Sequence, residues 1–186
     1  MTSLGALWLP ILLSAVFVFI ASSVLHMATP WHKNDYRSVP QEEQVTAALR
    51  PLAIPPGDYM VPRAKSMDQM RSPGFAEQMR QGPVLVMSVL PNGMTPMGGL
   101  LVKWFAYLLV VSFIAGGIAS HVLPPGSDRH VILHTTGMAA FLAYSLALWQ
   151  MAIWYRRSLG TTIRATIDGL VYGLITGATF AWLWPR

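Results

Sequence analysis

Residues 163–185 read IRATIDGLVYGLITGATFAWLWP, an apolar stretch in which small residues recur at every fourth position. The residues in this register are Ala165, Gly169, Gly173, Gly177 and Ala181. In a helix they share one face, where the backbone of a neighbouring helix can approach closely. Such close packing is how helices associate in lipid, where burying apolar surface gains little. We therefore predict that the rest of the chain packs against this helix.

Four apolar stretches are each long enough to cross a bilayer, which takes about 20 helical residues. They lie at about 5–27, 100–122, 131–154 and 163–184. Of the 186 residues, 53% are hydrophobic and 11% are charged, less than half of the ~25% charged residues usual in soluble domains. The second stretch has its own row of small residues, Ser112, Gly116 and Ser120. The predicted fold class is an all-α membrane protein, a bundle of four transmembrane helices.

The predicted organisation has three parts: helix 1 at 1–27, a hydrophilic segment at 28–99, and helices 2 to 4 at 100–186. The first stretch lacks the Lys or Arg that precedes the apolar run of a signal peptide, so we expect it to be retained. The middle segment contains ten of the fourteen prolines, which exclude one long helix. We do not expect so small and proline-rich a segment to fold independently of the bundle.

Local patterns predict short ordered pieces within 28–99. Ser38 resembles the start of a capping box, and the apolar spacing that follows predicts a helix near 39–50. A second short helix is expected near 74–81. The two stretches that resemble strands are 58–62 and 84–90, which would form a small sheet.

The charge distribution predicts orientation more than a binding partner. The net charge is +5, but no Lys and Arg cluster with interleaved aromatic residues is present, so a nucleic-acid partner is not expected. Arg156, Arg157 and Arg164 lie at the link between helices 3 and 4, which the positive-inside rule places in the cytoplasm. With four spans, residues 28–99 are then cytoplasmic and both termini lie outside, with the lipid bilayer as the expected environment.

Nothing in the sequence specifies an enzyme. The chain has no cysteine, and no GxSxG, HExxH, P-loop or dinucleotide motif is present. Seven of the eleven methionines lie within 28–99, and thioethers are ligands for copper(I). Their spacing is irregular apart from Met67 and Met70, so adaptable packing is the preferred interpretation.

The candidate metal ligands are three histidines at the outer ends of helices 2 and 3. His130 and His134 lie one turn apart, His121 lies across a short turn, and Asp128 is available as a fourth ligand. Neutral imidazoles suit zinc or copper, and bis-histidine haem ligation is a further alternative. Histidines at headgroup level are also ordinary interfacial residues, so no resident metal or haem is expected. His26 and His32, at the opposite end, form the weaker group.

Asp168 is the only acid within an apolar span, and an ionisable residue there is a functional candidate. Arg164 precedes it by one turn and could pair with it, which would make the two residues a structural anchor. The alternative is a proton or substrate contact that also involves Tyr172. Both interpretations stay open at this point.

The segments GALWLPILLSAVFVFIASSVLHM (5–27), WHKNDYRSVPQEEQV (31–45) and TIRATIDGLVYGLITGATFAWLWP (162–185) resemble small bacterial four-helix membrane proteins without an assigned activity. The likeness covers mainly the first helix with its following turn and the last helix. The proline-rich segment between helices 1 and 2 departs from shorter members. The resemblance implies the bacterial inner membrane and no particular chemistry.

Two functional hypotheses follow. The first is a non-catalytic accessory subunit or assembly factor, in which 28–99 caps the bundle and offers a surface to a protein partner; a homo-oligomer is the alternative form of association. The second is a small metal-binding or proton-linked membrane carrier that uses Asp168 or the three outer histidines. The first is preferred because four helices leave little room for a solute pathway.

Overall fold

The computed structural model describes residues 1–186 and groups them into two compact units. One unit comprises Met1–Arg37 and Pro96–Arg186, and the other comprises Ser38–Thr95. The ten residues that follow helix 1 therefore belong with the helical unit, although the sequence-based boundary lay at residue 28. That difference matters for function, because these residues carry most of the site described below.

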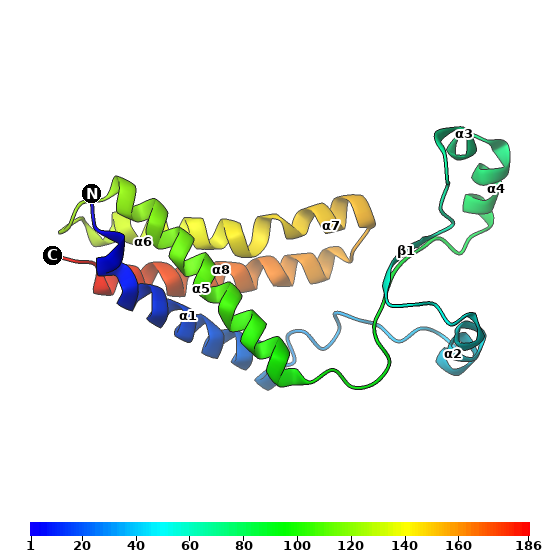
Figure 1. Cartoon of the computed structure of the whole chain (residues 1–186), viewed down its shortest axis with the longest axis horizontal. Helices are drawn as coiled ribbons and strands as arrows, with labels where there is room; N and C mark the ends of the chain where they lie inside the picture. Colours follow the sequence, from blue (N-terminus) through cyan, green and yellow to red (C-terminus); the bar gives the residue numbers. More distant parts are fainter. The chain divides into compact units, whose positions relative to one another are not determined.

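The helical unit contains four helices that are long and apolar enough to cross a membrane (Figure 1). They span Leu4–Ala28, Met97–Val122, Arg129–Tyr155 and Leu159–Leu183. The number and the places of the predicted apolar helices are thus confirmed. The second is helix α5 and the fourth is helix α8, each one continuous element.

The first of these helices ends in a π-helical turn, and the third is interrupted by one. The first consists of a 3₁₀ turn at Leu4–Leu7, α1 at Trp8–Ser23 and a π segment at Val24–Ala28. The third consists of α6 at Arg129–Phe141, a π segment at Leu142–Leu146 and α7 at Leu148–Tyr155. Single π turns within α-helices occur often at functional sites, and both of these carry residues that line one cavity.

The closest approach of two backbones is between α6 and α8. A Cβ atom built on Gly173 would lie 2.8 Å from the carbonyl oxygen of Gly137, and one on Gly177 would lie 2.6 Å from that of Leu133. Real side chains do not tolerate such distances, so these positions accept only glycine unless the helices separate. The glycine row of α8 is therefore the face that contacts α6.

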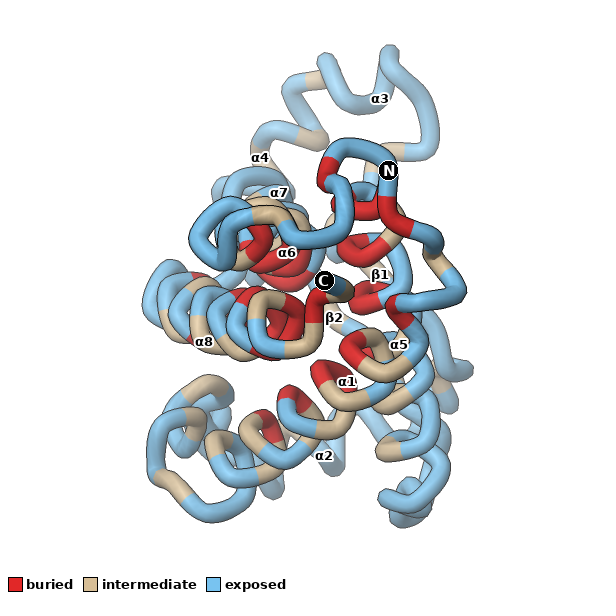
Figure 2. The backbone as a smooth tube through the Cα atoms, turned by 90° about the vertical axis from the view of Figure 1, so that its left-hand side faces the viewer, coloured by how far each residue is buried: buried red, intermediate tan, exposed pale blue.

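The small residues of α5 lie where this helix meets its neighbours. Ser112, Gly116 and Ser120 are all buried. The hydroxyl of Ser14 on α1 donates to Oγ of Ser112 at 3.0 Å, and a Cβ on Gly116 would lie 3.0 Å from the ring of Phe180 on α8. Buried residues accordingly gather on the sides of the four helices that face one another (Figure 2).

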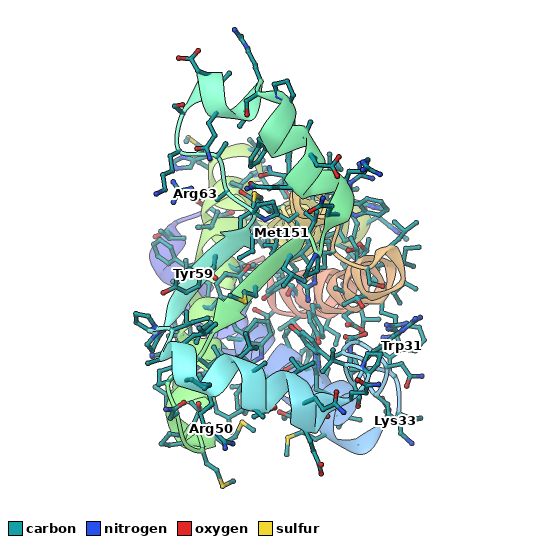
Figure 3. All side chains as sticks on the ribbon, turned by 90° about the vertical axis from the view of Figure 1, so that its right-hand side faces the viewer. Trp31, Lys33, Arg50, Tyr59, Arg63 and Met151 are labelled. Carbon is teal, nitrogen blue, oxygen red and sulfur yellow. The ribbon has the colours of Figure 1, made fainter.

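The second unit is a small mixed structure. Its elements are α2 (Glu42–Leu49), a 3₁₀ turn (Arg50–Leu52), β1 (Gly57–Val61), α3 (Met67–Met70), α4 (Pro73–Gln81) and β2 (Leu85–Val89). Strands β1 and β2 pair antiparallel, with Tyr59 opposite Met87; Figure 3 labels Tyr59 on β1, between Arg50 and Arg63 along the chain. Both predicted helices and both predicted strands are confirmed.

The predicted capping box at Ser38 is wrong. Helix α2 begins at Glu42, after Gln41 in a left-handed conformation (φ 54°), and no side chain caps its first turn. Because the helix starts at Glu42, Gln41 and not Ser38 occupies the N-cap position. Side-chain caps occur instead at Ser66, before the unpredicted α3, and at Ser72, before α4.

Candidate metal centre

Six side chains gather at the end of the helical unit where α1 finishes and α8 begins. His26 lies in the π segment that ends the first helix, and Asp168 and Arg164 lie on α8. The other three follow the first helix closely in sequence: Trp31, His32 and Asp35. We call these six residues the buried cluster after Asp168, the one member that is buried; Figure 3 labels Trp31 and the neighbouring Lys33.

Asp168 is the centre of the buried cluster and is only 4% exposed. The indole Nε1 of Trp31 donates a hydrogen bond to its Oδ1 atom at 2.9 Å. The second oxygen, Oδ2, lies 2.9 Å from Nε2 of His32. Each oxygen of this buried carboxylate therefore has a polar neighbour from the segment after the first helix.

The predicted pairing of Arg164 with Asp168 is wrong, because Arg164 pairs with Asp35. Its Nε atom donates to Oδ1 of Asp35 at 2.8 Å, and its Nη2 atom donates to the same oxygen. The two α8 residues are one turn apart and could have met. The segment after the first helix instead folds along α8 and supplies an acid for Arg164 and an imidazole for Asp168.

His32 lies between the two carboxylates. Its Nδ1 atom is 2.8 Å from Oδ2 of Asp35, with which it forms a hydrogen bond. Its Nε2 atom is within ion-pair distance of Asp168 but lacks the alignment of a hydrogen bond, so this buried nitrogen has no hydrogen-bond partner. Nε2 of His32 and Oδ2 of Asp168 are therefore arranged like two ligand atoms of one metal ion, and not like the donor and acceptor of a hydrogen bond.

The charge of Asp35 is fixed by its neighbours. Partial burial by itself raises the pKa of this carboxyl, but the hydrogen bonds from His32 and Arg164 outweigh burial and the pKa is lowered from its ordinary value. Asp35 is therefore a carboxylate that accepts from Nδ1 of His32. When the imidazole of His32 is neutral, that hydrogen bond places the lone pair on Nε2.

His26 completes the set from the first helix. Its Nδ1 atom lies 3.0 Å from the carbonyl oxygen of Ser22, and because a carbonyl only accepts, Nδ1 donates and the lone pair belongs to Nε2. The ring stacks on that of His32, with centroids 4.0 Å apart and planes at 13°. His26 is exposed, so its ring has room to turn.

One ligand atom from each of His26, His32 and Asp168 lies within 4.8 Å of the other two. Ligand atoms around zinc lie about 2.0–2.2 Å from the ion. His32 and Asp168 approach that arrangement: their ligand atoms are 2.9 Å apart and would separate to roughly 3.3 Å around a tetrahedral zinc ion with those bond lengths. His26 matches it only once its ring leaves the stack, because the lone pairs of two parallel rings cannot point at one ion.

The outer histidines proposed from the sequence are not brought together in this way. His121, His130 and His134 are all exposed, and they form no group of three converging ligand atoms. Oδ1 of Asp128 accepts from the backbone amide of His130 and caps the start of α6. The carboxylate considered as a fourth ligand is thus engaged as a helix cap.

The cluster had two signals in the sequence. Asp168, as the lone acid within an apolar span, required a polar partner from another element. His26 and His32 were already assigned to the same end of the bundle. What the sequence did not reveal is that residues 29–37 fold back along α8, since no periodic pattern marks that segment.

A cavity of about 630 Å³ adjoins the buried cluster. His26 and Asp168 line it together with Tyr144, from the second π segment, and Tyr172 from α8. Asp168 and Tyr172, which the sequence suggested as a proton or substrate contact, thus share the cavity wall. The candidate metal ligands therefore have an accessible space beside them.

No protein-family model, curated protein or solved structure matches this chain. The contacts of the buried cluster are therefore the basis for a functional proposal.

Proposed function

We propose that this chain is a multi-pass integral membrane protein that binds one divalent first-row metal ion through His26, His32 and Asp168. This is the metal-binding form of the second hypothesis drawn from the sequence. It keeps Asp168 and replaces the outer histidines by His26 and His32. Residues 28–99 form the proline-rich, partly ordered segment between the first two transmembrane helices of a four-helix bundle.

One observation carries the proposal: His32 and Asp168, the two ligand residues that already face each other, each have the other polar atom held by a partner. Nδ1 of His32 donates to Asp35, whereas the hydrogen bond from Nδ1 of His26 to the Ser22 carbonyl belongs to the stacked position of that ring. Oδ1 of Asp168 accepts from Trp31. Metal-binding histidines nearly always donate their second ring nitrogen to a carbonyl or carboxylate, which orients the ring and raises its basicity.

The donor set indicates which ions fit. Two imidazole nitrogens and one carboxylate oxygen are the ligands of catalytic zinc sites, which keep a fourth position open. The same set with further open positions is found for non-haem iron(II). Two carboxylates and one guanidinium leave the cluster with one net negative charge when its histidines are neutral, which favours a divalent cation.

The position of Asp168 within an apolar span supports metal binding. A charged aspartate within an apolar span is costly unless it is paired or binds an ion. In the cluster, Asp168 has only uncharged partners when His32 is neutral, so a bound cation would supply the missing charge. This argument favours metal binding over a purely structural anchor.

The orientation is a separate part of the proposal. Arg156, Arg157 and Arg164 favour a cytoplasmic link between the third and fourth helices, which places 28–99 in the cytoplasm and both termini outside. A reporter fused within 60–80 is expected to read as cytoplasmic. Labelling of Ser66→Cys by an impermeant reagent in intact cells would contradict this orientation.

Metal analysis of the purified full chain tests the function. Protein purified without chelator, or reloaded with Zn²⁺ or Fe²⁺, is expected to hold about one ion per chain, and Asp168→Asn is expected to hold none. Asp128→Asn is the matched control, because the cap carboxylate lies outside the cluster and asparagine caps equally well. His26→Gln provides a second variant with an exposed side chain, in case Asp168→Asn does not fold.

The accessory-subunit hypothesis is the alternative outcome. The exposed apolar residues of the paired strands β1 and β2, Met60, Val61, Leu85 and Val86, support it, because such surfaces often bind partners. A wild-type chain that remains free of metal after loading would overturn the metal proposal and favour the subunit hypothesis.

A further inference from the structure

The cavity beside the buried cluster has a wall formed by four aromatic rings in mutual contact. Trp104 stacks on Tyr107 with centroids 5.5 Å apart, and Tyr107 meets Tyr144 edge-on at 5.9 Å. Tyr144 then meets Tyr172 at 5.5 Å, and Tyr172 meets Trp104 at 6.5 Å, which closes the ring of contacts. All four residues line the cavity.

Two of these tyrosines are buried without a hydrogen-bond partner. Tyr144 is 8% exposed and Tyr172 is 4% exposed, and neither hydroxyl has a partner. The neighbouring polar groups are satisfied: the Tyr107 hydroxyl donates to the Ala143 carbonyl at 3.0 Å, and Trp104 Nε1 donates to Ser22 at 2.9 Å. A buried hydroxyl left unpaired is unfavourable by about 1–3 kcal/mol. Both hydroxyl oxygens are themselves buried, so a small movement of each ring would let a ligand in the adjoining cavity become the partner.

The position of Tyr144 supports a functional role for the cavity. This residue lies in the π segment Leu142–Leu146, a backbone distortion that is characteristic of functional sites. The bulge packs closely against α8, where a Cβ on Gly169 would lie 1.8 Å from Oγ of Ser145. The π segment and Gly169 on α8 therefore pack against each other beside Tyr144, which lines the cavity.

The charges around the cavity restrict what it can hold. Its lining contains no Lys or Arg, so an anionic headgroup would meet only Asp168. Asp168 is a proposed metal ligand, so a cationic headgroup would compete with the metal ion for this carboxylate. A neutral molecule with oxygen acceptors avoids both conflicts and suits two free hydroxyl donors.

The shape and the apolar lining point to a flat ring with a lipid-soluble tail. Aromatic walls favour stacked or edge-on contact with a planar partner. Met27 and Met97, which also line the cavity, are 75% and 62% exposed, and Leu101 and Leu148 add further apolar surface. The volume of about 630 Å³ lies within the range of small-molecule sites.

We propose that this cavity binds a neutral, flat, lipid-soluble ring that carries carbonyl oxygens, the chemistry of a quinone, with Tyr144 and Tyr172 as its hydrogen-bond donors. This assignment goes beyond metal binding and stands on different residues. The ring lies against the aromatic wall, its oxygens accept from the two tyrosines, and its tail passes between Met27 and Met97. No electron transfer is part of the proposal.

Equilibrium binding of decylubiquinone to the full chain in detergent or in lipid nanodiscs tests the proposal. Saturable binding of about one molecule per chain is expected. Tyr144→Phe and Tyr172→Phe are each expected to weaken it about 3- to 10-fold, the effect of one hydrogen bond. Tyr155→Phe is the control, because Tyr155 is exposed at the end of α7 and outside the cavity.

The two phenylalanine variants are informative because they should fold well. Each removes a hydroxyl that has no partner in the free protein, so thermal stability is expected to be unchanged or raised. Metal content, measured in the same samples, is expected to equal that of the wild type, which separates this test from that of the metal centre. Decanoic acid at equal concentration, tested on chelator-treated protein, should not compete, since the lining contains no Lys or Arg for its charged head.

Three results would overturn the proposal. These are the absence of saturable decylubiquinone binding, equal affinity in the wild type and both phenylalanine variants, and displacement of decylubiquinone by decanoic acid at matched concentration. Each would show that the cavity does not recognise a carbonyl-bearing ring through its tyrosines.

Discussion

The two ends of the helical unit both carry histidines, but only the end with fewer of them brings its ligand atoms together. At the α5–α6 loop, His121, His130 and His134 are exposed and separate. At the other end, His26 and His32 meet Asp168 within 4.8 Å. The number of histidines at one end therefore predicts a metal site less well than the contacts that orient their side chains.

The difference arises from what each connecting segment does. The α5–α6 loop is short, and its one carboxylate, Asp128, caps the next helix. The chain after the first helix instead folds back along α8 and supplies Trp31, His32 and Asp35 in succession. Trp31 holds Oδ1 of Asp168, and Asp35 holds Nδ1 of His32. Supporting partners of metal ligands act in this way.

The largest effect is expected from breaking the crossing that holds both ends in place. In Gly173→Leu the branched side chain would enter the space 2.8 Å from the Gly137 carbonyl, and we expect a loss of about 3 kcal/mol or more of stability. Thermal unfolding followed by circular dichroism measures it. Gly117→Leu on α5 is the control, since no atom lies within 4 Å of that position; equal stability of the two variants would refute the close crossing.

The next largest effect contrasts one histidine from each end. His32→Ala removes a proposed ligand, and we expect zinc affinity to fall by more than about 100-fold, beyond the range of supporting residues. His130→Ala is expected to leave zinc affinity unchanged. A competition titration with a zinc-sensitive dye measures both, and a larger loss in His130→Ala would reverse the assignment of the two ends.

A smaller effect is expected from the acid that supports His32. Asp35→Asn weakens the hydrogen bond to Nδ1 of His32 and leaves Arg164 without its carboxylate, so zinc affinity should fall by about 10- to 100-fold. Asp128→Asn at the other end keeps its cap and should keep wild-type affinity. If both variants bound zinc like the wild type, Asp35 would have no orienting role.

The smallest effect is expected at the indole. Trp31→Phe removes only the donor to Oδ1 of Asp168, and we expect a decrease in zinc affinity of up to about 10-fold, at the lower limit for supporting residues. Trp154→Phe is the control because this indole is 77% exposed and distant in sequence. A decrease that Trp154→Phe reproduces would assign the effect to general destabilisation.

The sequence predicted most of the fold because apolar length and periodicity are strong signals. The four long helices and the paired strands β1 and β2 lie where these patterns placed them. The failures were local: Gln41 in a left-handed turn moved the start of α2 away from the Ser38 cap. Such a turn has no periodicity, so pattern alone does not predict it.

The site was only half visible in the sequence. Asp168 was identified as a candidate because a lone acid in an apolar span is conspicuous. Its partners were assigned wrongly, since the helical spacing to Arg164 was readable while the fold of residues 29–37 was not. A contact between segments more than 130 residues apart, such as that of His32 with Asp168, depends on tertiary structure.

X-ray absorption spectroscopy of the zinc-loaded full chain tests the central claim most directly, because it identifies the ligands of the ion. We predict two imidazole nitrogens at about 2.0–2.1 Å with oxygen ligands completing the shell. The spectrum should be unchanged in the double variant His130→Ala with His134→Ala. A shell without imidazole scattering, or imidazole scattering that disappears in that double variant, would contradict a centre formed by His26, His32 and Asp168.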